Sequence, residues 1–333
     1  MAKIKKTFLC FLLSGLALSI YANPHITFCG SESNDLYLLL KKQDIALQHY
    51  ASIEDAIRNA KRKTAIIIVA DNYPLHRVKI YPKTYKEAQQ KGLKLYVEYP
   101  DFIPGYPQST TQIVGNLERG VVTSAFFGDS LPPMSLLGIN GCHLYPINVS
   151  KPLISFAKVA GFDKAEYGLT DTDVYPLLFR EDNTLIAMSS LSTFRTNRFA
   201  PVDSWKIVWE SILTWLIGET ISLKEWTSDP TPSFSQNAIL SPDARINSIR
   251  RGSDWFFNGR FLVHPSWKEH WLHYQSDGLT PFGPPVIKNF LVGNGSLGIL
   301  EGHASKIYWN SKQQYRYWMR SGFRSCFGIC IIK

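Results

Sequence analysis

The sequence predicts an α/β protein: a doubly wound parallel sheet over the first two thirds of the chain, followed by the start of a helical domain. Between residues 25 and 218, short apolar runs alternate with segments of helical spacing, as a parallel sheet requires. The run AIIIVA (65–70) is continuous and mostly β-branched, which is typical of a strand buried on both faces. After residue 241 the composition changes, and turn-forming residues become frequent. All nine tryptophans fall between Trp205 and Trp318.

The expected elements follow from these runs. Strands are predicted at HITFCG (25–30), AIIIVA (65–70), LKLYVEYP (93–100), RGVVTSAFF (119–127) and TLIAMSS (184–190). Helices are predicted in NDLYLLLKKQDIALQHY (34–50), SIEDAIRNAKRK (52–63), TYKEAQQK (84–91), DSWKIVWESILTWLI (203–217) and PDARINSIRRGSDWFFN (242–258). Ser52 with Asp55 resembles a capping box, and Gly92 and Gly218 suit helix C-termini. Loops or short β segments are expected between residues 100 and 184, where the alternation is irregular.

Residues 1–22 are predicted to be a secretory signal peptide. Lys3, Lys5 and Lys6 form a positive start, an apolar core follows, and Ala22 precedes the expected cut. Loss of the three lysines lowers the formal net charge from +9 to +6. The predicted location is therefore the periplasm or the extracellular space, without a stable membrane anchor, because the apolar run is too short to span a bilayer with flanks.

The composition and the net charge limit the classes of partner that the protein is expected to bind. The chain is 45% hydrophobic and 19% charged, which is an ordinary globular balance for two domains with proper cores. A modest positive charge favours solubility, with acidic ligands such as uronic-acid sugars as the alternative. No run of basic residues follows the signal peptide, so no nucleic-acid partner is expected.

Residues 226–242 contain three prolines and four serines and show little periodicity, which indicates a linker. The predicted division is a signal peptide at 1–22, an α/β domain at 23–225, a linker at 226–240, a partial helical domain at 241–320 and an aberrant tail at 321–333. Ser241 and Pro242 suit the cap and first turn of the helix that follows the linker.

Nucleophilic catalysis is poorly supported by the residues. Cys29 and Cys142 are the two cysteines outside the signal peptide and the tail, and they are predicted to be buried free thiols, with a disulfide as the alternative. Cys142 precedes His143, but neighbours on a strand point to opposite faces. The serines in SSLSTF (189–194), with Ser190 as the candidate, lack the glycines of a nucleophile elbow. Alanine at Cys142 or Ser190 would test hydrolase chemistry there.

No cofactor or metal is predicted. Gly293, Gly295 and Gly298 have the spacing of a dinucleotide fingerprint but lack its flanking strand and helix. His270 and His273 could share a helical face, yet they do not form the HExxH motif and no third ligand is recognisable.

Two resemblances add to these observations. Residues 25–218 resemble the class I glutamine-amidotransferase-like domain fused to many bacterial carbohydrate enzymes, through AIIIVADNYP, LYVEYPDFIPG, RGVVTSAFFGDSLPPMSLLGINGCHLYPI and MSSLSTFRTNRFAPVDSWKIVWESILTWL. This resemblance implies a flavodoxin-like sheet, and a homo-oligomer because related domains often assemble. It implies no amidotransferase activity, since the elbow nucleophile is not recognisable.

Residues 241–320 resemble the opening of a six-hairpin (α/α)6 glycosidase of the bacterial β-glucuronidase type, through INSIRRGSDWFFNGRFLVHPSWKEHW and PFGPPVIKNFLVGNGSLGILEGHASKIYWNSKQQYRYWMR. The resemblance implies a glycoside hydrolase by ancestry that acts on an oligo- or polysaccharide and is inactive in this incomplete form. The alternative is a secreted glycan-binding or scaffold protein without catalysis. The tail SGFRSCFGICIIK is expected to result from a lost reading frame, with a genuine short strand as the alternative.

The candidate site residues all lie after the linker. Glycoside hydrolysis needs two carboxyl groups across the scissile bond, and the candidates are Glu301 and Glu269. The alternative for Glu301 is a structural carboxylate in a turn. The predicted substrate-binding residues are His303, Trp267, Trp271 and Tyr274, because aromatic rings stack on sugar rings. The alternative for these aromatic residues is the packing face of a helix.

Overall fold

The computed structural model describes residues 25–43, 45–115, 117–194, 198–224, 226, 238–259, 261–266, 273–280, 291–310 and 313–319. The predicted signal peptide, most of the predicted linker and the predicted tail lie outside these ranges, so those predictions stay as they were made.

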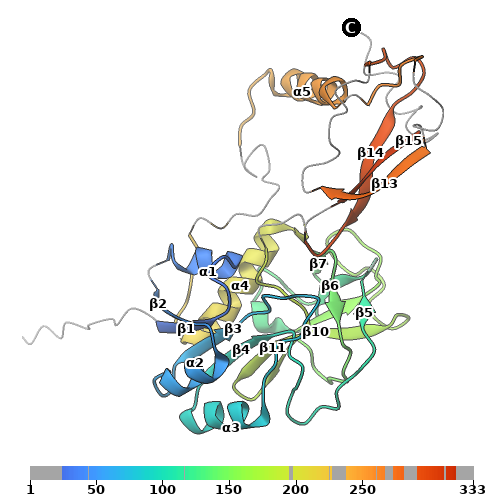
Figure 1. Ribbon diagram of the computed structural model, residues 1–333. Helices are drawn as coiled ribbons and strands as arrows, with labels where there is room; N and C mark the ends of the chain where they lie inside the picture. The colour runs from blue at the N-terminus through green and yellow to red at the C-terminus, as the bar shows by residue number, and fades with distance from the viewer. Residues whose placement is uncertain are drawn as a thin grey trace, which may run out of the picture.

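A ten-stranded mixed sheet forms the centre of the α/β region, with the strand order β12-β7-β6-β9-β10-β11-β4-β3-β1-β2 (Figure 1). Five neighbouring strands pair in parallel: β2 (Ala46–Tyr50), β1 (His25–Cys29), β3 (Ala65–Ile68), β4 (Lys94–Glu98) and β11 (Thr184–Ala187). Five more extend the sheet through antiparallel pairs: β10 (Val174–Glu181), β9 (Ile154–Ala157), β6 (Arg119–Val122), β7 (Leu136–Ile139) and β12 (Phe199–Ala200). A separate small sheet pairs β5 (Ile113–Val114) with β8 (His143–Leu144).

The prediction of a doubly wound parallel sheet is therefore wrong for half of the sheet. The chain between β4 and β11 forms β-strands where a doubly wound fold would place a crossover helix. The turn Asp182–Asn183 joins β10 to β11 in two residues, and so short a turn allows only an antiparallel neighbour. Asp182 has a φ of 47°, a conformation that Asp adopts more readily than most residues.

Two pairs of helices cover the parallel strands. Buried side chains of α1 (Asp35–Leu40) and α4 (Val202–Ile217) share one core cluster with β1, β3 and β4. Those of α2 (Ile53–Asn59) and α3 (Pro82–Lys91) form a second cluster on the opposite face, where Leu95 and Val97 of β4 point. A short 3-10 helix, Ala125–Phe127, follows β6. Among the described residues, no helix is long and apolar enough to cross a membrane.

Several local predictions are confirmed. The Ser52 hydroxyl accepts a hydrogen bond from the Asp55 N–H at the start of α2. Gly92 ends α3 and Gly218 ends α4, both in the left-handed conformation. The helix predicted over 34–50 is wrong, because α1 stops at Leu40 and the apolar residues beyond it belong to β2, which pairs with β1.

The expected all-helical toroid segment is contradicted as well. Among the described residues of 241–320, the only helix is α5 (Ala244–Asn258). It is followed by an antiparallel sheet of order β13-β15-β14, which consists of β13 (His273–Thr280), β14 (Leu300–Ile307) and β15 (Gln313–Met319). The alternation of Tyr315 and Tyr317 favours a strand, and this local preference prevails over the resemblance to a helical family.

Candidate functional site

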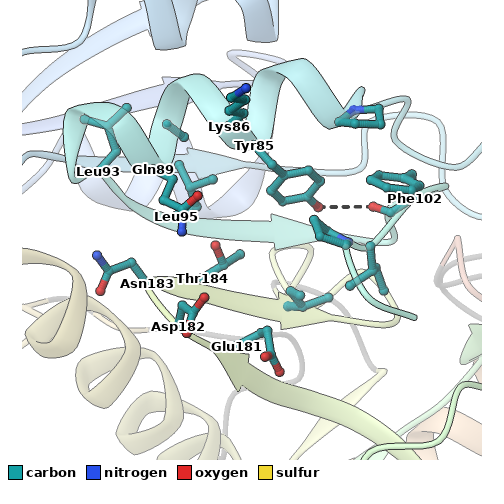
Figure 2. Close-up of a pocket in the computed structure, with 15 residues that line it drawn as sticks. Tyr85, Lys86, Gln89, Leu93, Leu95, Phe102, Glu181, Asp182, Asn183 and Thr184 are labelled. Carbon is teal, nitrogen blue, oxygen red and sulfur yellow. Dashed lines mark hydrogen bonds between the residues drawn. The ribbon is translucent and has the colours of Figure 1, made fainter.

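A groove of about 660 Å³ runs between α3 and the hairpin formed by β10 and β11 (Figure 2). Its floor contains Leu95 of β4 and Ile186 of β11, two side chains that pack against neighbouring apolar residues. The volume lies within the range of pockets that take small ligands.

The groove exists because the α2–α3 layer ends at α3. A crossover helix between β4 and β11 would lie beside α3 and cover this part of the sheet. The chain instead continues into the antiparallel extension, so the face of β4 and β11 next to α3 stays open.

Two aromatic rings lie at one end of the groove. The rings of Tyr85 and Phe102 are 6.2 Å apart between centroids and are tilted by 56°. The Tyr85 hydroxyl donates a hydrogen bond to the Phe102 carbonyl oxygen at 3.2 Å, which fixes both residues (Figure 2). Burial, and secondarily the charge of Asp101, raises the pKa of Tyr85, so its phenol stays neutral near pH 7.

Polar groups line both walls of the groove but differ in charge. Lys86 and Gln89 lie on the α3 wall, whereas Glu181 at the end of β10 and the turn residues Asp182 and Asn183 lie across from them (Figure 2). The carboxylates among the described lining residues therefore all belong to one wall. These carboxylate, amide and ammonium groups can donate and accept hydrogen bonds with a polar ligand.

A buried carboxylate, Glu98, lies at the end of β4 and accepts five hydrogen bonds. Its Oε1 accepts from the Tyr96 hydroxyl and the Leu191 and Ser192 N–H groups at 2.7 to 2.9 Å. Its Oε2 accepts from the Ala70 N–H at 3.1 Å and the Ser192 hydroxyl at 2.8 Å. Burial raises the pKa of Glu98 even though these donors act in the opposite direction. The five hydrogen bonds connect the ends of three segments. Because the side chain is fully buried, it is not accessible to a solute.

The turn after β4 lacks a nucleophile. Tyr99 occupies it with a φ of 45°, a strained conformation also found where elbow nucleophiles sit. Burial raises the pKa of the Tyr99 phenol to about 12, which keeps it protonated and poorly nucleophilic at neutral pH.

Cys142 and Ser190 also lack the geometry of catalysis. Both residues are fully buried, whereas the neighbouring His143 is half-buried and its Nδ1 contacts the Gln112 side-chain oxygen at 3.3 Å. The expectation that Cys142 and His143 do not face each other agrees with this difference in burial. Cys29 and Cys142 are both free and buried, which confirms the prediction of two free thiols.

Both thiols are expected to resist alkylation. Burial, the largest cause in each case, raises the pKa of Cys29 to about 12 and that of Cys142 to about 11. At pH 8 the thiolate fraction of Cys142 is then about one in a thousand. Iodoacetamide at pH 8, followed by peptide mass mapping, should label neither residue in the native protein and both in urea. Rapid labelling of native Cys142 would contradict this environment.

A second hollow of about 730 Å³ is polar and lies where β5, β9 and β10 approach one another. It is lined by Glu118, Asp171, Asp173 and Lys158 among other residues. Among the residues of the chain that are described, no group of three or more His, Cys, Asp or Glu side chains is arranged to hold a metal ion.

The residues predicted from the sequence lie elsewhere. Tyr274 is in β13, and Glu301 and His303 are in β14, in a sheet that lies far from α3 in Figure 1. His303 pairs with Tyr315 across the β14–β15 ladder. Glu269, Trp267 and Trp271 lie outside the described residues. These catalytic and substrate-binding roles stay predictions.

The groove residues were missed by sequence reasoning. The signals available were the aromatic and proline-rich segment YPDFIPG (99–105) after a strand and the EDN turn (181–183) between two apolar runs. Each marks a loop, but neither shows that the two loops flank the same open stretch of sheet.

Comparison with known proteins adds no family to this description: no family model, no curated protein and no solved structure matches the chain. Fold and site define an α/β protein with a mixed ten-stranded sheet and an aromatic, carboxylate-rimmed groove.

Proposed function

We propose that the protein is a secreted glycan-binding protein and that the groove between α3 and the β10–β11 turn holds a sugar segment without cleaving it. The observation that supports this proposal most directly is the combination of the Tyr85 and Phe102 rings with hydrogen-bonding groups on both walls. Sugar rings present an apolar face and a hydroxyl rim, and such a groove offers a partner for each.

The rim supplies fixed acceptors and donors. Glu181 accepts a hydrogen bond from the Tyr106 hydroxyl at 2.8 Å through Oε2, which holds its carboxylate in place. Asn183 and Gln89 carry amides that both donate and accept. A pyranose with its ring against Tyr85 would meet these groups through its hydroxyls.

Tyr85→Ala is expected to weaken glycan binding about 5- to 30-fold, because the lost ring contact is worth about 1–2 kcal/mol. Screening the full chain on an oligosaccharide array would give the probe, and calorimetry with that oligosaccharide would give the affinities. Tyr81→Ala is the matched control, since Tyr81 precedes the same helix, is 48% exposed and does not line the groove.

Chromatography of the incubated oligosaccharide separates binding from hydrolysis. Intact sugar after long incubation is expected. Release of shorter products that is lost in Glu181→Gln would replace the binding proposal with a hydrolase at the same groove. Equal affinities of the wild type and Tyr85→Ala would remove the groove as the site.

A further inference from the structure

Three tyrosines cluster beside the carboxyl ends of the parallel strands β3 and β4. Tyr73 follows β3, Tyr99 follows β4 and Tyr145 follows β8. The ring centroids of Tyr73 and Tyr99 are 5.0 Å apart, with an edge-to-face angle of 76° between the ring planes. The ring centroids of Tyr99 and Tyr145 are 5.9 Å apart. The carboxyl ends of parallel strands are where open α/β sheets bind their ligands.

The tyrosine cluster, Tyr73, Tyr99 and Tyr145, is held by groups of the α/β region itself. The Tyr73 hydroxyl lies 2.8 Å from the Ser189 hydroxyl and accepts from the His143 N–H at 2.5 Å. The side-chain amide of Gln112 donates to the Tyr99 hydroxyl at 2.8 Å. The guanidinium of Arg77 lies over the Tyr145 ring, 4.5 Å from its centroid.

Arg77 is itself fixed, because its Nε and one terminal nitrogen both donate to the Pro100 carbonyl oxygen. The tyrosine cluster is therefore built by contacts within the α/β region. None of these contacts involves a residue of the C-terminal sheet.

Trp309 occupies this cluster. It lies in the β14–β15 connection and packs against the buried group that contains Ala70, Tyr73 and Tyr99. The backbone of the connection passes closely over Gly141, which has a φ of 59°. A Cβ atom at Gly141 would lie 2.3 Å from the Trp309 nitrogen and 2.7 Å from the Tyr308 carbonyl carbon. Because Gly141 has no Cβ atom, the connection between β14 and β15 can approach its backbone this closely.

The geometry points to a second ligand site at the tyrosine cluster, one that binds the ring of an aryl glycoside and that the chain's own Trp309 fills in the absence of ligand. The site is preformed, lies where α/β folds place ligands, and already holds a ring. It is separate from the groove beside α3, and only the choice of a glycoside as the ligand rests on the proposed function.

An internal occupant lowers the apparent affinity for an external ligand by the fraction of time that the site is empty. A cluster filled for 90–99% of the time binds about 10- to 100-fold more weakly than an empty one. Trp309→Ala is therefore expected to strengthen the binding of phenyl β-D-glucopyranoside by about that factor in calorimetry. All proteins carry Tyr85→Ala, which weakens any binding in the groove equally in each of them.

Gly141→Ala provides a second route to the same state, because its methyl group collides with the backbone of the connection that carries Trp309 and deletes no aromatic side chain. It should raise the affinity as well, and it should add little when combined with Trp309→Ala. Tyr145→Ala added to Trp309→Ala should abolish binding. Trp255→Ala, at a tryptophan that is 47% exposed on α5, is the control and should change nothing.

Thermal melting of each variant confirms that it is folded before the titration is interpreted. Affinities that stay at the wild-type value in both folded Trp309→Ala and folded Gly141→Ala would overturn the proposal. A gain that survives Tyr145→Ala would overturn it too, because the glycoside would then bind outside the cluster.

Discussion

Glu98→Gln is expected to lower the free energy of unfolding by about 3–5 kcal/mol, since an amide cannot accept the hydrogen bonds that a carboxylate accepts. Five donors converge on Glu98, three on Oε1 and two on Oε2. An NH2 group in place of Oε1 would face the fixed N–H donors of Leu191 and Ser192, and one in place of Oε2 would face the Ala70 N–H. The buried N–H groups of Leu191 and Ser192 have no water to replace the lost acceptor.

Urea denaturation followed by far-UV circular dichroism measures this change. Glu219→Gln is the matched control, because Glu219 lies just after α4 and is exposed, and it should shift the midpoint by little. A loss below about 1 kcal/mol for Glu98→Gln would show that the five contacts do not hold the strand ends together as described.

Trp205→Ala is expected to cost about 4–5 kcal/mol, near the upper end for a buried aromatic residue. The Trp205 side chain is fully buried in α4 and meets Phe199 edge-on at 4.9 Å between centroids. Its indole N–H donates to the Gly138 carbonyl oxygen of β7 at 3.0 Å. The substitution leaves a cavity and a carbonyl without its donor, and the two costs add.

A second tryptophan of α4 separates these two costs. Trp209 is equally buried, but its indole nitrogen has no hydrogen-bond partner among the described residues. Trp205→Phe should therefore destabilise more than Trp209→Phe, by about 1–2 kcal/mol, because only the former breaks a hydrogen bond. Denaturation midpoints of the two variants in the same urea series test this. Equal losses would mean that packing alone accounts for the cost.

The sequence predicted those elements whose signals are local. The β-branched run at 65–70 is a buried strand, Ser52 caps its helix, and Gly92 and Gly218 end theirs. Each of these features depends on a few neighbouring side chains and on backbone preferences that hold in any fold. The burial of Cys29 and Cys142 as free thiols was also predictable, because both adjoin apolar runs.

The C-terminal prediction was wrong because it depended on a resemblance and not on local signals. Strands β13, β14 and β15 replace the expected helices, in a segment where alternating aromatic residues favour extended backbone. The roles of Glu301, His303 and Tyr274 stay predictions in this new setting.

Only the tertiary structure decided where a ligand can bind. The groove depends on a helix that is missing beside α3 and on a two-residue turn that reverses β10. Tyr85 and Glu181 line its opposite walls although 96 residues separate them. The tyrosine cluster likewise joins the ends of β3, β4 and β8 with Trp309. By itself the sequence determined the buried strands and the helix ends. Which strands became neighbours, and which face of the sheet stayed open, followed from long-range pairing that no local pattern encodes.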